Sequence, residues 1–337
     1  MSQKVIKITT PYADWPLVRQ TPGGKGVWED CNFYVNDDSI KECDYWIVCE
    51  GLQEKETVTC SEKNTVFFAW EPPSVKKYNH QFLNQFHRVV SSDKDIDHSN
   101  LIFSQQGLPW MVGARFLKNR TWDSFKNYDY FNINDIPPKN KLLSVILSNK
   151  NFTEGHRLKV AFVEQLKIHF KEAIDIYGVG FKEIPDKWDA IAPYKYHIVL
   201  ENSTFENYWT EKLSDAYLGN TFPVYYGCVN ILNYFSKNSL EIIDISKPKA
   251  AIETIENLIN NDFYEKRAPS IAGAKKLILN KYNIFPVIRQ IIMSDGHNTE
   301  KRQITLLPAL DFEKHTKKKQ NSKILQFIKK KLKLLIK

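Results

Sequence analysis

The stretch Tyr194–Asn230, YKYHIVLENSTFENYWTEKLSDAYLGNTFPVYYGCVN, contains two strand patterns, a polar loop and a helix start in one continuous segment. Apolar and β-branched residues predict a buried strand at residues 196–200, and this strand ends abruptly in polar residues 201–203. Residues 210–213 open an amphipathic helix, and residues 222–227 predict the next buried strand, closed by a glycine. Because ligands bind beyond the carboxyl ends of parallel strands, the segment predicts a binding crevice.

The predicted helix has Lys212 in its first turn. The amino terminus of a helix carries unpaired N–H groups and a partial positive charge, which attract anions. A lysine beside that terminus therefore suits a phosphate group.

These residues resemble the signature of the family 10 glycosyltransferases, whose best-known members are the α-1,3/1,4-fucosyltransferases. In that family a strand ends in Glu-Asn-Ser, a loop carries an aromatic residue, Thr-Glu-Lys follows, and a Pro-Val strand closes in glycine. The chain matches this order at residues 200–203, Tyr208, residues 210–212 and residues 223–227. The resemblance is strongest from residue 142 to residue 245, and it implies a GT-B fold and inverting transfer of fucose from GDP-fucose.

The rest of the chain alternates strand and helix patterns, which is typical of α/β proteins with parallel sheets. In the amino-terminal half, strands are predicted at residues 4–9, 44–50, 65–70 and 88–91. In the second half we predict strands at residues 142–147, 174–178 and 240–245, a helix at residues 154–170, and further helices between residues 250 and 295. Turn residues and a diproline make residues 134–140 the predicted linker.

We therefore predict an α/β fold of GT-B type, with two Rossmann-like domains facing a cleft. Residues 1–140 are the predicted acceptor-side domain, residues 141–312 the nucleotide-sugar-binding domain, and residues 313–337 a basic tail. A length of 337 residues with 42% hydrophobic residues is enough for two such cores. Five cysteines without paired spacing predict a reducing compartment, the cytoplasm, and the amino terminus lacks the long apolar stretch of a secretory signal or membrane anchor. Because eukaryotic members of the resembled family usually carry such an anchor, the resemblance implies a bacterial protein.

The formal net charge of +8 is concentrated in the tail, since residues 317–337 contain nine lysines and no acidic residue. Apolar residues recur there at helical spacing, and lysines occupy the other faces, as in helices that bind an anionic membrane surface. We predict peripheral association with the inner membrane, while a solvated helix is the alternative. Nucleic acid is not an expected partner, because the tail has one aromatic residue, Phe327, and no arginine.

Sugar transfer from a nucleoside diphosphate requires groups that stabilise the departing diphosphate. Arg157, early in the helix that follows residues 148–150, and Lys212 are the predicted contacts. The resemblance implies the same roles, since the family has a matching arginine and a matching lysine. A surface position on the helix remains the alternative for Arg157.

The resemblance also implies donor contacts from Asn202, Tyr208 and Glu211, with Glu211 holding hydroxyls of the sugar or the ribose. Asn202 has the alternative of capping a turn. Glu201 and Ser203 are further possible site residues, and a hydrogen-bonded structural role is equally open for Glu201.

Inversion by a single displacement requires a general base on the side opposite the leaving group. In the amino-terminal half the strand pattern at residues 65–70 ends in Glu71, between Trp70 and a diproline, a rigid setting that suits a base. The resemblance implies a base on a similar strand-end glutamate, although Trp-Glu-Pro-Pro departs from the commonest family pattern. A structural turn glutamate is the alternative.

No HExxH or CxxC motif and no clear Asp-x-Asp metal site occurs, so we predict no metal site and no required cofactor. Stimulation by Mn²⁺ or Mg²⁺ stays open. The expected partners are the donor GDP-fucose and a glycan acceptor of a surface polysaccharide or lipopolysaccharide. Two alternatives remain: another GDP-sugar as donor, and an inactive glycan-binding or membrane-surface protein.

Overall fold

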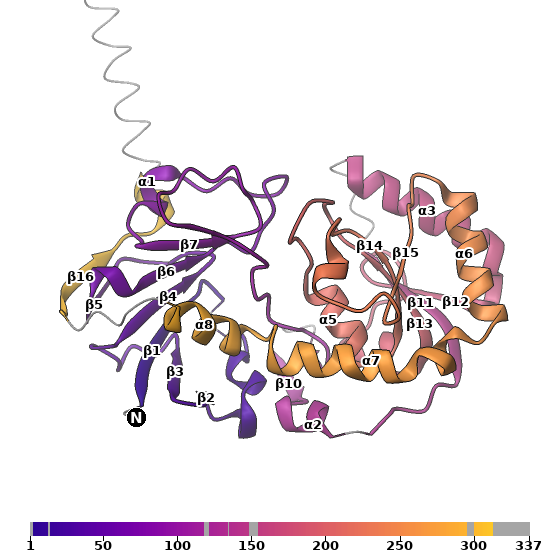
Figure 1. The fold of residues 1–337 in the computed structure, drawn as a ribbon, viewed down its shortest axis with the longest axis horizontal. Helices are drawn as coiled ribbons and strands as arrows, with labels where there is room; N and C mark the ends of the chain where they lie inside the picture. Colours follow the sequence, from indigo (N-terminus) through magenta and orange to yellow (C-terminus); the bar gives the residue numbers. More distant parts are fainter. Residues whose placement is uncertain are drawn as a thin grey trace, which may run out of the picture. The chain divides into compact units, whose positions relative to one another are not determined.

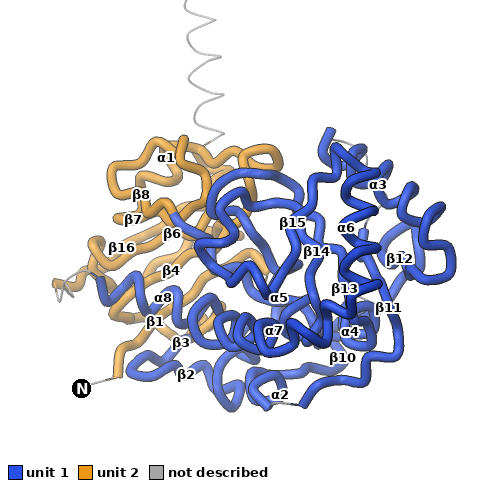
Figure 2. The backbone as a smooth tube through the Cα atoms, turned by 45° about the vertical axis from the view of Figure 1, so that its right-hand side comes forward, with its two compact units in different colours: residues 1, 14–33, 104–295 blue, residues 2–13, 34–103, 296–337 orange. Residues whose placement is uncertain are grey.

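The computed structural model describes residues 3–12, 14–117, 121–133, 135–147, 154–294 and 300–312. The chain forms two compact units (Figure 2). Unit 1 consists of residue 1, residues 14–33 and residues 104–295, and unit 2 consists of residues 2–13, 34–103 and 296–337. Each unit contains a sheet with neighbouring parallel strands (Figure 1).

The sheet of unit 1 has five parallel strands in the order β12-β11-β13-β14-β15. These strands are β11 Lys141–Ile146, β12 Ile174–Tyr177, β13 Tyr194–Leu200, β14 Phe222–Tyr226 and β15 Glu241–Ile242. Strand β13 is the central strand of the five, and it is buried along nearly its whole length. Burial on both faces explains why its sequence is an almost continuous apolar run.

The helices of unit 1 are α2 Tyr128–Asn132, α3 Glu154–Phe170, α4 Trp188–Ile191, α5 Glu211–Leu218, α6 Pro248–Asn260, α7 Phe263–Asn280 and α8 Ile284–Met293. Helices α3 and α6 lie side by side, and α5 contacts α7 (Figure 1). The buried stripe of α3 is Lys159, Phe162, Val163 and Leu166, at the spacing that puts side chains on one helix face. A short antiparallel pair, β9 Ala114–Phe116 and β10 Trp122–Phe125, completes the unit.

Unit 2 has parallel strands in the order β1-β4-β6-β7-β8. They are β1 Lys4–Thr9, β4 Tyr45–Cys49, β6 Thr65–Phe68, β7 Arg88–Ser91 and β8 Leu101–Phe103, with the short helix α1 His80–Leu83 between β6 and β7. The antiparallel pair β5 Glu56–Cys60 and β16 Arg302–Leu306 also belongs to this unit. Antiparallel β2 Val27–Trp28 and β3 Cys31–Val35 span the point where the chain passes from unit 1 to unit 2.

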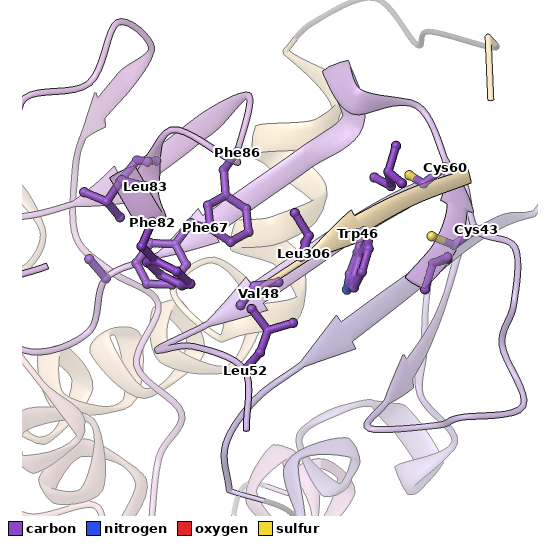
Figure 3. Close-up of a cluster of buried hydrophobic side chains, with 14 residues drawn as sticks. Cys43, Trp46, Val48, Leu52, Cys60, Phe67, Phe82, Leu83, Phe86 and Leu306 are labelled. Carbon is purple, nitrogen blue, oxygen red and sulfur yellow. The ribbon is translucent and has the colours of Figure 1, made fainter. Parts of the chain in front are cut away.

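The core of unit 2 is a cluster of buried aromatic and aliphatic side chains (Figure 3). Trp46 and Phe67 come from the sheet, Phe82 and Phe86 from the segment after β6, and Leu306 from β16. Phe67 packs edge-on against Phe82, with ring centroids 5.3 Å apart. Residues from both ends of the chain therefore share one core.

The units divide the chain differently from the predicted boundaries at residues 140 and 312. Residues 14–33 and 104–133 belong with unit 1, because the buried Arg19 guanidinium donates to the carbonyls of Trp110 and Val112, and the N–H groups of Met111 and Val112 donate to Asp215. Residues 300–312 belong with unit 2, since β16 pairs with β5. These contacts join segments far apart in the sequence, and local patterns do not record them.

Strand and helix predictions within each half are largely confirmed, and β1, β7 and α3 have the predicted bounds. The predicted strand at residues 240–245 is shorter, with only two residues in β15. None of the described helices is both long and apolar enough to cross a bilayer. The predicted tail, residues 313–337, lies outside the described residues.

Candidate active site

Glu201 directly follows strand β13, and its side chain connects the end of that strand to the start of helix α5. Its side chain is buried, and its carboxylate accepts hydrogen bonds from the Thr210 N–H and the Thr210 hydroxyl, both at 2.8 Å. Lys212 lies 3.3 Å from the same carboxylate. Gly227 makes room for this arrangement, because a Cβ atom there would lie 2.4 Å from Cγ of Glu201. Of the two roles considered for Glu201, these contacts favour the structural one.

Glu211 and Lys212 form the exposed side of a charged network at the amino terminus of α5. Lys212 lies 3.5 Å from Glu211, and Lys187 lies 3.5 Å from Glu211 and 2.8 Å from the buried Asp215. Thr210 caps the helix by accepting a hydrogen bond from the N–H of Lys212. The sequence prediction that these two residues begin a helix is confirmed, and both side chains are only partly buried.

The charges of this network shift its pKa values. Burial by itself would raise the pKa of Glu211, but the charges of Lys212 and Lys187 outweigh it and lower the pKa to about 2. Burial would lower the pKa of Lys212, whereas Glu211 and Glu201 raise it well above its ordinary value. Both groups are therefore charged at neutral pH.

We expect the ionised form of Glu211 to contribute to stability in a defined pH range. Because its pKa falls from 4.5 to about 2 on folding, this contribution is complete above pH 4.5 and is lost as the pH falls through about 2. Urea unfolding midpoints measured between pH 7 and pH 2 should fall less steeply for Glu211→Gln than for the wild type. Equal slopes for the two proteins would contradict this coupling.

Lys159 is the residue that sequence reasoning missed in unit 1. It is buried on α3, and its ammonium group donates a hydrogen bond of 2.6 Å to the side-chain oxygen of Asn202. Burial, followed by the positive charge of Lys212, lowers its pKa to about 8. Two ammonium groups that repel one another beside a sheet edge form a site that a bound anion would stabilise. The sequence feature that could have identified Lys159 is a lysine within the apolar stripe of a predicted helix.

Arg157 lies two residues before Lys159 on α3 and is exposed. Two residues turn an α-helix by about 200°, so the two side chains leave on nearly opposite faces. The structure brings Lys159 to Asn202, and a diphosphate contact from Arg157 stays a prediction. The turn at residues 148–150, on which the prediction for Arg157 depended, lies outside the described residues.

The loop between β13 and α5 holds the remaining predicted donor contacts. Asn202 and Ser203 are partly exposed. Tyr208 is buried, and its ring packs against that of Phe205 with centroids 4.8 Å apart. Tyr208 therefore helps to shape the loop, and a contact with donor stays a prediction for all three residues.

A cavity of about 260 Å³ opens at this edge of the unit 1 sheet. Its walls come from the ends of the strands and the start of α5, and they include Leu147, Gly178, Leu200, Glu211 and Lys212. Gly178 has φ +118°, and a Cβ atom there would lie 2.0 Å from the carbonyl oxygen of Leu147. The wall is mostly apolar with a charged rim, which suits a ligand that has a flat ring and an anionic group.

Glu71 follows β6 in unit 2 and is partly buried. Its N–H donates to a carboxylate oxygen of Glu50 at 3.1 Å, and Glu50 follows the neighbouring strand β4. Sequence reasoning did not select Glu50, although the same pattern of a buried strand ending in glutamate marks both positions. Within the described residues, no three His, Cys, Asp or Glu side chains are grouped so as to hold a metal ion.

Known proteins match part of this chain. Residues 136–266 match the model of the C-terminal domain of glycosyltransferase family 10 (fucosyltransferase). A 4-galactosyl-N-acetylglucosaminide 3-alpha-L-fucosyltransferase 9 of Mus musculus is 28% identical over 134 residues, which are 38% of this chain and 36% of the relative. The alpha-(1,3)-fucosyltransferase FucT of Helicobacter pylori is 30% identical over 76 residues, or 22% of this chain and 16% of that one. The chain thus spans about a third of the mammalian relative that it matches.

One solved structure supports the fold over a wider range. A crystal structure of an alpha1,3-fucosyltransferase aligns with 88% of this chain and 91% of its own, with a TM-score of 0.50 and 16% identity. Identity at this level is informative about fold alone, and the predicted α/β fold of GT-B type is confirmed. The segment that matches glycosyltransferase family 10, residues 136–266, contains β13 and α5 and therefore the candidate site.

Proposed function

We propose that this protein transfers fucose from GDP-fucose to a hydroxyl group of a glycan, with inversion at the anomeric carbon. The observation that carries the proposal is a pair of ammonium groups at the carboxyl edge of β13: Lys212 lines the largely apolar cavity, and the positive charge of Lys212 acts on Lys159, which is bound to Asn202. The names of the matching relatives, which are fucosyltransferases, support the choice of sugar.

The two lysines would bind the diphosphate of the donor. Each charge-assisted hydrogen bond to a phosphate contributes about 1.5–3 kcal/mol, and more where negative charge builds up in the transition state. Binding of the anion also removes the repulsion between the two ammonium groups. Glu211, held ionised by Lys212 and Lys187, can accept hydrogen bonds from sugar or ribose hydroxyls. The apolar cavity wall would receive the guanine ring.

Glu71 would act as the general base. The acceptor oxygen attacks the anomeric carbon of fucose, the bond from that carbon to the diphosphate oxygen breaks, and GDP leaves with the bonding electrons. The acceptor hydroxyl proton passes to the Glu71 carboxylate. The assignment of Glu71 as the base is based on reaction chemistry, because a single displacement requires the base to lie on the side opposite the leaving group.

A panel of GDP-sugars tests the donor. The purified full-length chain is incubated with each sugar, with and without oligosaccharide acceptors, and released GDP is measured. We expect release from GDP-fucose, increased by an N-acetylglucosamine- or glucose-containing acceptor. Release from another GDP-sugar alone would keep the transferase and replace the donor, whereas GDP binding without release from any donor would favour an inactive glycan-binding protein.

We propose that the reaction does not require a metal ion, with cationic side chains replacing the divalent ion of other transferases. The same assay in EDTA should retain turnover. Stimulation by Mn²⁺ or Mg²⁺ is compatible with the proposal, whereas loss of all activity in EDTA, restored by Mn²⁺, would overturn it.

We further propose that the protein is cytoplasmic and bacterial, and that its tail binds the inner membrane. Each tail lysine near an anionic leaflet contributes about 1 kcal/mol, reduced by salt. A chain ending at Phe312 should remain folded and soluble but leave vesicles of anionic lipid in a sedimentation assay. Equal sedimentation of the full-length and shortened chains would contradict the proposal.

A further inference from the structure

Glu50 lies beside the proposed base at the carboxyl edge of the unit 2 sheet. It follows β4 directly, and Glu71 follows β6, the strand that pairs with β4 in parallel. The N–H of Glu50 donates to the carbonyl oxygen of Phe68 at 3.0 Å and so continues the strand pairing by one residue. The two glutamates therefore emerge from adjacent strands at the same edge.

The carboxylate of Glu50 is the centre of a hydrogen-bond network with the segment after β6. One oxygen accepts the N–H of Trp70 at 2.6 Å, the N–H of Glu71 at 3.1 Å and the hydroxyl of Tyr78. The other oxygen pairs with Lys76 at 2.8 Å, and Lys76 also donates to the Glu50 carbonyl at 2.9 Å. One side chain thus ties residues 70 to 78 to the sheet edge.

Without such partners, the position of Glu50 would destabilise the folded protein. Its side chain is buried, and its backbone has φ +67°, in the left-handed region that non-glycine residues seldom adopt. Strain of this kind persists where the surroundings determine the conformation, and it is concentrated at functional sites. Here the hydrogen bonds from residues 70–78 hold Glu50 in this conformation.

We propose that Glu50 is a positioning residue that fixes the backbone of Trp70 and Glu71, and thereby directs the Glu71 carboxylate toward the acceptor hydroxyl. The proposal rests on the proposed function, in which Glu71 is the base. Glu50 itself does not touch the reacting atoms, because its oxygens are occupied by the protein.

The charge of Glu50 gives this role a pH signature. Lys76 and Tyr78 from the segment after β6, Tyr12 after β1 and Cys49 on β4 all interact with Glu50. Among these, Lys76 is the cation, and a neutral side chain at position 50 leaves the charge of Lys76 uncompensated. Both the lost anion and the released cation favour the ionised form of Glu71, so the acid limb of the pH–rate profile should move to lower pH.

Glu50→Gln in the full-length chain is the test, with Tyr78→Phe as a milder variant that removes the hydroxyl's hydrogen bond to Glu50 and the one it accepts from the Glu71 N–H. For Glu50→Gln we expect kcat to fall about 10- to 100-fold, since a shift of the base of about 1 Å has that effect. The KM for GDP-fucose should stay within about twofold, because the donor contacts lie on other strands, and the acid limb should move to lower pH. Hydrogen exchange of a peptide containing Trp70 and Glu71 should become about 10-fold faster or more.

Asp44→Asn is the matched control. Asp44 precedes β4, accepts the N–H of Val5 at 2.8 Å and pairs with Lys301 at 2.9 Å, so it resembles Glu50 in chemistry but lies at the opposite end of the strand. Asp44→Asn should change thermal stability. It should leave the acid limb of the pH–rate profile and the hydrogen-exchange rates of residues 70 and 71 unchanged.

Each outcome separates the two proposals. Unchanged kcat, pH profile and exchange in a folded Glu50→Gln protein would overturn the positioning role and leave the transferase intact. Turnover retained by Glu71→Gln would remove the base and the positioning role together, while the donor chemistry would stand. If no donor is turned over, the exchange measurement still decides whether Glu50 holds the segment.

Discussion

Glu71→Gln is expected to abolish detectable fucose transfer while GDP-fucose binding stays near that of the wild type. Glutamine has the shape of glutamate but cannot take the acceptor proton, and loss of a general base lowers rates roughly 10²- to 10⁴-fold. Donor affinity should persist, because the proposed diphosphate contacts Lys159 and Lys212 belong to unit 1. The measurement is single-turnover transfer combined with calorimetric titration of GDP-fucose.

The matched control for this variant is Glu62→Gln. Glu62 lies just before β6, whereas Glu71 lies just after it, and the Glu62 side chain is 60% exposed in a surface ion pair with Arg302. Its replacement should leave turnover within about twofold, since surface pairs contribute little to stability. Wild-type turnover by Glu71→Gln would remove Glu71 from the role of base.

Lys212→Ala should lower kcat/KM for GDP-fucose by about 100-fold or more, which corresponds to one strong charge-assisted contact that strengthens in the transition state. Affinity for GDP alone should fall as well, because the same ammonium group binds the product diphosphate. Removal of Lys212 also leaves the buried Glu201 without its cation, so part of the change will be seen as a lower melting temperature.

Two further lysines make the effect of Lys212→Ala interpretable. Lys195→Ala removes a lysine on β13 that pairs with Glu265, and it should leave turnover unchanged. Lys159→Ala should weaken GDP binding, and more at pH 7 than at pH 9, since the pKa of Lys159 is about 8 before an anion binds. Wild-type affinity of a folded Lys212→Ala protein for GDP would place the diphosphate elsewhere.

Local sequence patterns were sufficient to locate the strands and helices that carry the candidate site. Strand β13 is a long apolar run ended by polar residues, and α3 has an apolar stripe at helical spacing, so both could be located from sequence. The Thr-Glu-Lys sequence correctly placed the start of α5, because threonine caps the helix.

Residues whose roles depend on distant partners could not be found in this way. Glu50 meets Trp70, Lys76 and Tyr78, which follow it by 20 to 28 residues, and only the parallel pairing of β4 with β6 brings them together. Lys159 is similar, because its partner Asn202 lies 43 residues later. A lysine in an apolar stripe is normally interpreted as a side chain that extends to solvent, and the sequence does not show the distant amide oxygen that binds it.

The return of residues 302–306 to unit 2 has a consequence for biosynthesis. As the ribosome makes the chain from its amino terminus, β5 and the hydrophobic cluster around Phe82 emerge more than 200 residues before β16, Ile304 and Leu306 can cover them. Synthesis of unit 2 therefore begins before that of unit 1 and ends after it. The apolar residues that β16 covers in unit 2 remain without this cover while unit 1 is synthesised. Chimaeras that exchange donor specificity with a relative must accordingly transfer discontinuous segments, since a single junction near residue 140 would cut through both units.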